Sequence, residues 1–277
     1  MLNFMKYKYI YFLVSLAVIV PGTISLARYG LRPSIDFTGG TLWEIKTPNP
    51  PAIEGNIQKT GDNYTIRTKP LSEPEHQELA AKLASNSAEF EEIRFETVGP
   101  ILGKELLKKT ITAVAVVSGL ILLFVAWRFK HFSFGLSAIL AMFHDTLVLL
   151  GSFSLLGHFY GVEIDTLFVT AMLTILSFSV HDTIVVFDRI RETRKLNPQT
   201  KFEDIVDKAI AQTMGRSLNN SMTIIFMLLA LYLLGGETVK YFALALLIGT
   251  ISGTYSSTFT AAPLLVVWEN LQKRRST

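Results

Sequence analysis

The chain has 277 residues, of which 49% are hydrophobic and 18% charged, and its mean hydropathy is +0.37. This composition excludes an ordinary soluble domain and predicts an integral membrane protein. Cysteine is absent, which excludes disulfide bonds and thiol or cysteine–zinc chemistry, and the net charge of +3 gives no reason to expect a nucleic-acid partner.

Six long stretches carry almost no charge, and each approaches or exceeds the roughly 17 to 25 residues that a membrane-spanning helix needs. They are residues 9–27, 110–127, 132–156, 164–187, 218–234 and 241–268. A cleaved signal peptide is the alternative for the first, because a basic start and an apolar core precede Ser25-Leu26-Ala27. Its length favours a retained helix, so we expect one transmembrane helix in residues 1–28 and five more in residues 109–277.

Basic residues gather in every second connection of this pattern, as cytoplasmic loops do in membrane proteins. We therefore expect both termini in the cytoplasm and residues 29–108 outside it. The long connection at about 189–216 also contains an apolar helical face, which predicts an amphipathic helix lying on the membrane or on a partner. That face consists of Phe202, Ile205, Val206, Ala209 and Ile210.

The segment at 29–108 is mixed polar and charged, which predicts a small α+β domain. Its signals are a strand-like alternation at 41–47, a hairpin turn at 61–63, a helix-capping pattern at 72–75 and a further strand at 90–98. A β-β-α-β order of this kind favours a ferredoxin-like layer. No catalytic constellation occurs in it, and we expect no enzymatic activity.

An aspartate, Asp182, lies deep in the fourth apolar stretch. A carboxylate near the centre of a bilayer costs roughly 2.5 to 3.5 kcal/mol on insertion scales, so such a group indicates transport or proton transfer. A polar face runs along the same predicted helix, although hydroxyls in membranes also bond their own backbone. It comprises Thr166, Thr170, Thr174, Ser177 and His181.

Arg216, at the start of the fifth stretch, is the natural counter-ion for Asp182. If the two pair and separate during a conformational cycle, the carboxylate can bind and release a proton. The alternative is that Arg216 only extends to the membrane surface and anchors its helix.

The third stretch contains a second ionisable pair, His144 and Asp145. Because adjacent residues of a helix do not share a face, we expect separate partners for them. Asp145 suits a proton relay and a structural hydrogen bond to a neighbouring helix equally well. A metal site is disfavoured because the two His-Asp pairs lack i,i+4 ligand spacing. An aspartyl protease would need two facing aspartates, which Asp145 and Asp182 provide only in number.

Four segments resemble motifs of the SecD/SecF protein-export family, on its SecF side, and the resemblance extends over essentially the full length. They are residues 34–41 (SIDFTGGT, with Asp36, Gly39 and Gly40), residues 98–100 (VGP), residues 182–192 (DTIVVFDRIRE, with Asp188 and Arg189) and residues 242–257 (with Gly249 and Gly253). The two last glycines have the GxxxG spacing that allows close helix packing.

The resemblance implies six transmembrane helices, similar to half of a resistance-nodulation-division (RND) transporter, in a bacterial cell membrane. It also implies a SecD-like partner, the SecY channel and an unfolded secreted polypeptide as substrate, with protons as the coupling ion and no other cofactor. By position, Asp182 and Arg216 would form the proton-responsive pair. His181 stands where the family has asparagine and Asn220 where it has threonine, so an extra imidazole lies beside Asp182 and would change the pH at which the relay operates.

Two other functions remain open at this point. The chain could be a half-sized exporter of small molecules or lipids that works as a homodimer, although about 80 outer residues leave little room for a drug-sized pocket. It could also be a passive scaffold of the channel, in which case Asp182 is structural.

Overall fold

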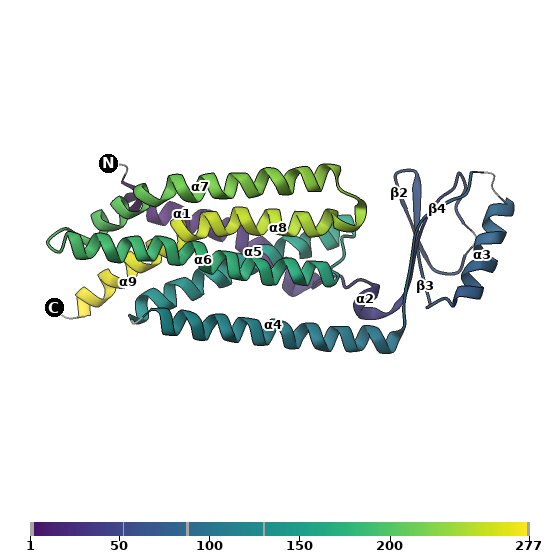
Figure 1. The fold of residues 1–277 in the computed structure, drawn as a ribbon, viewed down its shortest axis with the longest axis horizontal. Helices are drawn as coiled ribbons and strands as arrows, with labels where there is room; N and C mark the ends of the chain where they lie inside the picture. Colours follow the sequence, from purple (N-terminus) through teal and green to yellow (C-terminus); the bar gives the residue numbers. More distant parts are fainter. Residues whose placement is uncertain (1–2, 52, 87–88, 130, 276–277) are drawn as a thin grey trace. The chain divides into compact units, whose positions relative to one another are not determined.

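The computed structural model describes residues 3–51, 53–86, 89–129 and 131–275 (Figure 1). The chain divides into two compact units. The larger, helical unit comprises Met1–Arg32 and Val114–Thr277, and the smaller unit comprises Pro33–Ala113.

Six helical stretches within the described residues are long and apolar enough to cross a membrane, which confirms the six predicted helices. Their bounds are η1 (Phe4–Tyr7) with α1 (Lys8–Tyr29), α4 (Pro100–Arg128), α5 (Phe132–Tyr160), α6 (Thr166–Leu196), α7 (Phe202–Leu234), and α8 (Glu237–Ser256) with η2 (Ser257–Ala261) and α9 (Ala262–Arg275). The last stretch contains a π-helical turn, η2, between two α-helical parts. Such turns are rare and frequently lie at functional sites.

Helix α6 lies at the centre of the helical unit and packs against α5, α7 and α8, while α1 packs against α5 (Figure 1). Two glycines allow the close approach of α1 and α5, since a Cβ atom on Gly22 would lie 2.9 Å from the Cα atom of Gly151. Next to this contact, the hydroxyls of Ser25 and Ser154 lie 2.8 Å apart. Small residues thus set the spacing of these two helices, as is usual in membranes.

The apolar face predicted at the start of α7 does not lie free on the membrane or on a partner. Phe202, Val206 and Ile210 are buried in the main core cluster of the helical unit, together with Met5 from the N-terminal segment. The backbone N–H of Met5 donates a 2.8 Å hydrogen bond to Asp207. The prediction was wrong because the amphipathic face covers the chain's own N-terminal segment, which the sequence pattern does not reveal.

The smaller unit is a four-stranded antiparallel sheet with strand order β2-β3-β1-β4. Its elements are α2 (Ile35–Thr38), β1 (Gly40–Lys46), β2 (Asn56–Thr60), β3 (Asn63–Thr68), α3 (Glu73–Asn86) and β4 (Glu91–Val98). The hairpin predicted around residues 61–63 is formed by β2 and β3, so three strands precede helix α3, one more than the β-β-α-β order had. The α+β class is confirmed.

One face of this sheet carries the core of the smaller unit. Trp43, Ile45 and Ile66 are fully buried, and Leu79 and Leu83 of α3 pack against them. Alternation along β1 sends Trp43 and Ile45 to this face, as the pleat of a strand requires.

Candidate functional site

The carboxyl group of Asp182 is buried between three helical segments. Only 6% of the residue is exposed, although it lies on a helix that is apolar enough to cross a membrane. Its Oδ2 atom accepts a 2.8 Å hydrogen bond from the hydroxyl of Ser217 on α7. The hydroxyl of Ser257, the first residue of η2, lies 3.4 Å from the same oxygen. Two neutral hydroxyls therefore hold this carboxyl group.

In the isolated chain, Arg216 is not the ion-pair partner of Asp182 that the sequence predicted. Within residues 3–51, 53–86, 89–129 and 131–275, no ion pair joins Arg216 to Asp182, and Arg216 is exposed. Successive residues of an α-helix point about 100 degrees apart. Because Ser217 faces Asp182, the preceding side chain is turned to the outside of the chain.

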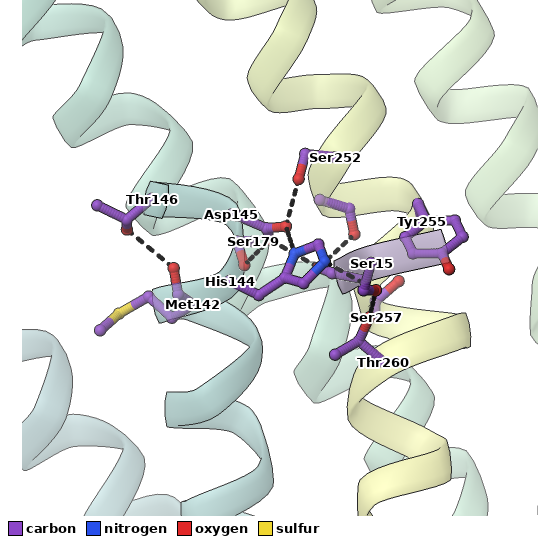
Figure 2. Close-up of polar contacts among 12 residues, drawn as sticks. Ser15, Met142, His144, Asp145, Thr146, Ser179, Ser252, Tyr255, Ser257 and Thr260 are labelled. Carbon is purple, nitrogen blue, oxygen red and sulfur yellow. Dashed lines mark hydrogen bonds and ion pairs between the residues drawn. The ribbon is translucent and has the colours of Figure 1, made fainter. Parts of the chain in front are cut away.

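A second buried carboxyl group, that of Asp145 on α5, accepts hydrogen bonds from serines of two other helices. Its Oδ2 atom accepts from Ser179 of α6 and from Ser256 of α8, both at 2.6 Å. Its Oδ1 atom accepts from Ser252 of α8, also at 2.6 Å (Figure 2). The structure thus shows the expected hydrogen bonds from neighbouring helices, and Asp145 is only 1% exposed.

His144 and Asp145 have the separate partners that were expected, but they also contact each other, which was not predicted. The Nδ1 atom of His144 lies 3.0 Å from Oδ1 of Asp145. The Nε2 atom of His144 lies 3.0 Å from the hydroxyl of Ser15 on α1. That hydroxyl is 3.3 Å from Thr260 of η2 (Figure 2). The imidazole therefore connects Asp145 to α1.

The serines that contact the two carboxyl groups were missed at the sequence level. Ser252 and Ser256 are four residues apart and so share one face of α8. This spacing could have indicated them, but the segment was interpreted only through the GxxxG spacing of Gly249 and Gly253. Ser217 was not predicted as a partner of Asp182, because the preceding residue, Arg216, has the opposite charge and was the predicted counter-ion. Ser257 could not be found from spacing, because it lies where the helix changes from α to π geometry.

The predicted polar face of α6 lies on the outside of the chain. Thr170, Thr174, Ser177 and His181 are exposed, whereas Asp182 is turned inward. Thr170 and Thr174 donate to backbone carbonyl groups four residues earlier, which is the structural role considered for these hydroxyls. On α7, Arg216 and Asn220 are exposed as well. We call these six residues the outer polar face.

The family model described as "Protein export membrane protein SecD/SecF, C-terminal" matches residues 78–271. A SecF protein translocase subunit of Thermobaculum terrenum is 45% identical over 98% of this chain and 95% of its own length. The chain belongs to the SecD/SecF protein-export family. A SecF subunit of Anaerolinea thermophila is 38% identical with the same coverage of both chains.

A solved member of the SecD/SecF family shows the same fold in a longer chain. The crystal structure of SecDF, a translocon-associated membrane protein from Thermus thermophilus, superposes with a TM-score of 0.86 at 36% identity. The match covers 97% of this chain but only 39% of SecDF. This chain is therefore a multi-pass membrane protein that matches one part of a longer relative.

Two SecD/SecF family motif residues, Asp188 and Arg189, stabilise one end of the helical unit. Asp188 on α6 forms ion pairs with Arg128 at the end of α4 and with Arg191. Arg189 donates a 2.8 Å hydrogen bond to Gln212 of α7. These contacts tie α4, α6 and α7 together a few residues beyond Asp182.

The motif in the smaller unit shapes the backbone. Gly39 and Gly40 have φ angles of +74° and +126°, a region that side-chain-bearing residues rarely adopt. A Cβ atom on Gly39 would lie 2.8 Å from the Cα atom of Pro100, and one on Gly103 would lie 2.8 Å from the backbone nitrogen of Gly39. Asp36 lies in the short helix α2 of the same segment. This turn therefore requires glycine and packs directly on the start of α4.

The glycines of the last span pack within the helical unit. A Cβ atom on Gly249 would lie 2.2 Å from the Ile175 side chain, and one on Gly253 would lie 3.6 Å from the Cα atom of Ser179. Close packing of α8 on α6 brings Ser252 and Ser256 within reach of Asp145. Across the part of the chain that the structure describes, no three His, Asp or Glu residues are grouped so that they could hold a metal ion.

Proposed function

We propose that this chain is the SecF-type subunit of a bacterial protein-export machinery, which uses the proton motive force to assist translocation of secreted polypeptides through a SecY-type channel. The support is family membership together with one observation. Asp182 is a buried carboxyl group in a membrane-spanning helix, held by neutral hydroxyls. An ionisable side chain at such a place is costly and is usually retained for ion or proton transport.

The outer polar face supports a SecD-like partner with its own membrane helices. Hydroxyl, imidazole, amide and guanidinium groups are poorly accommodated by lipid tails, and they are best covered by polar groups of another helix. The fused SecDF relative has more than half of its length outside the region that this chain matches. We assign that additional part to a separate subunit and the outer polar face to its contact surface.

Cross-linking tests this contact surface. In a chain that has no natural cysteine, Ser177→Cys should form disulfides with cysteines scanned through the membrane helices of the partner. The matched control is Leu13→Cys, at an exposed position of α1 on an apolar part of the chain. Equal cross-linking at both positions, or cross-linking at Leu13 only, would place the partner elsewhere.

Proton uptake at Asp182 would change how its carboxyl group bonds Ser217 and Ser257. A protonated carboxyl group can donate as well as accept a hydrogen bond, whereas an ionised one only accepts. Each charge that crosses the membrane field gains about 2.3 kcal/mol per 100 mV. Exposed Arg216 lies beside Ser217 on the partner-facing side, where it can respond to the charge of the site from outside the bundle.

The distribution of basic residues supports an orientation with both termini in the cytoplasm and the smaller unit outside. The smaller unit is then placed where a secreted chain leaves the channel. The same architecture, six helices with one outer α+β unit, suits half of an RND-type transporter.

The function is tested by reconstituting the chain with a SecD-like partner and a SecY-type channel in vesicles that carry a labelled precursor. An imposed proton gradient should raise the yield of late translocation only when both subunits are present. The matched control is the same vesicle with a protonophore added. The proposal would be contradicted if the yield of translocation rose equally without this chain, or if it did not depend on the proton gradient.

A further inference from the structure

Two adjacent serines at the start of η2 contact the two buried carboxyl groups separately. Ser256 donates to Oδ2 of Asp145 at 2.6 Å, and the hydroxyl of Ser257 lies 3.4 Å from Oδ2 of Asp182. Both serines are fully buried. Because consecutive helical residues point about 100 degrees apart, one helix can contact an aspartate of α5 and an aspartate of α6 through neighbouring residues.

The hydroxyl of Ser257 has a choice of acceptors. It lies 3.2 Å from the backbone oxygen of Thr254 as well as 3.4 Å from Asp182. A hydroxyl has one proton to donate, so the two contacts compete. A change at the Asp182 carboxyl group therefore alters a hydrogen bond inside the helix, at the point where α geometry gives way to π geometry.

The same turn is also joined to α1. Thr260 of η2 lies 3.3 Å from the hydroxyl of Ser15, which is the residue that His144 contacts (Figure 2). Tyr255, at the end of α8, donates a 2.8 Å hydrogen bond to the backbone oxygen of Tyr11. A displacement of η2 would therefore also displace α1. This helix directly precedes the smaller unit in the sequence.

We propose that η2 is the connecting element of the proton site: Ser257 positions Asp182, Ser256 positions Asp145, and the π-helical turn transmits a change at one carboxyl group to the other and to α1. Ser256 and Ser257 are positioning residues. The inference deepens the proposed function, because Asp182 is its proton-binding group, but its test contains no transport step.

The test measures the carboxyl carbon signal of Asp182 by solid-state NMR. This chain is labelled with 13C at its aspartate carboxyl groups and assembled with its SecD-like partner in lipid bilayers. The signal is identified by its loss in Asp182→Asn. Ser256→Ala and Ser252→Ala each remove one 2.6 Å hydrogen bond from Asp145, and neither serine has a hydrogen bond to Asp182 among the described contacts.

Ser256→Ala should displace the Asp182 signal more than Ser252→Ala does, because only Ser256 adjoins Ser257. Equal displacement by both variants would show that coupling runs through Asp145 itself rather than through the turn. No displacement by Ser256→Ala would show that the carboxyl groups are independent. Either result overturns the inference.

The reciprocal measurement keeps the inference falsifiable if Ser256→Ala fails to fold. Ser257→Ala should displace the Asp145 signal, which is identified by its loss in Asp145→Asn. The matched control, Ser217→Ala, removes a hydrogen bond from Asp182 on the side of α7 without touching the turn, and should displace the Asp145 signal less than Ser257→Ala does. If gradient-driven export is intact while neither reciprocal shift occurs, the coupling is wrong and the proposed function stands.

Discussion

The hydroxyl of Ser217 on α7 donates a 2.8 Å hydrogen bond to Oδ2 of Asp182 on α6. This contact joins a neutral donor to a buried carboxyl group, and the hydroxyl of Ser257 lies 3.4 Å from the same oxygen. The charged neighbour, Arg216, faces outward in the chain by itself. The carboxyl group is thus held by an internal hydroxyl, while the cation remains available to the surface that we assign to the partner.

Removing this hydroxyl should weaken proton coupling without preventing assembly. For Ser217→Ala we expect the gradient-stimulated translocation rate to fall roughly three- to tenfold, the effect of losing a hydrogen bond worth about 0.5 to 1.5 kcal/mol. The control is Thr223→Ala on α7, because that exposed hydroxyl donates only to the backbone oxygen of Asn219. A Ser217→Ala rate equal to that of the control would show that the contact does not matter for coupling.

Neutralising Asp145 should destabilise the bundle. In Asp145→Asn an amide NH2 group would face hydroxyls that now donate to a carboxylate, so a buried polar group loses partners at a cost of about 1 to 3 kcal/mol. The thermal unfolding midpoint in lipid nanodiscs should fall, whereas exposed Asp204→Asn should leave it nearly unchanged. Equal midpoints would argue against a structural role of Asp145.

The packing of α8 on α6 should tolerate no side chain at Gly249. A Cβ atom there would lie 2.2 Å from Ile175, so Gly249→Ala should cost about 1 to 3 kcal/mol through overpacking. Gly119→Ala is the control, because nothing lies within 4 Å of its Cβ position. Unfolding measurements should also show that Ile175→Ala relieves part of the Gly249→Ala defect. Additive losses in the double variant would contradict direct contact.

The buried side chains at the start of α7 should contribute to the stability of the helical unit. Ile210 is fully buried, so Ile210→Ala should lower the free energy of unfolding by about 2 to 5 kcal/mol. Leu196→Ala, at a residue that is 72% exposed, provides the control and should have little effect. If Ile210→Ala lost only membrane or partner binding while stability was kept, the apolar face would be a free surface after all.

Much of the fold was predictable because membrane spans are long and their apolar composition leaves few alternatives. All six predicted stretches are helical. The smaller unit was predicted less completely, since short strands depend on pairing rather than on local pattern. The apolar face that includes Phe202 and Val206 was misassigned because its packing partner lies elsewhere in the chain. Periodicity reveals an apolar side of a helix but not what covers it.

For the site, the sequence revealed the two costly carboxyl groups but not how they are held. Asp182 and Asp145 stand out because charge is rare in a span. Their donors are serines, which are common residues in membrane helices and carry no such signal. The contact between His144 and Asp145 was also unforeseen, because side-chain rotation allowed adjacent residues to meet.

The measurement that tests the account most directly is gradient-dependent export with Asp182→Asn, a change that keeps the shape of the side chain but removes its titratable group. The variant must first be shown to insert in the membrane and to bind its SecD-like partner. We predict that the proton gradient no longer stimulates translocation, while exposed Asp204→Asn responds as the unmodified chain does. Full stimulation of Asp182→Asn would contradict the account and leave Asp182 as a structural polar group.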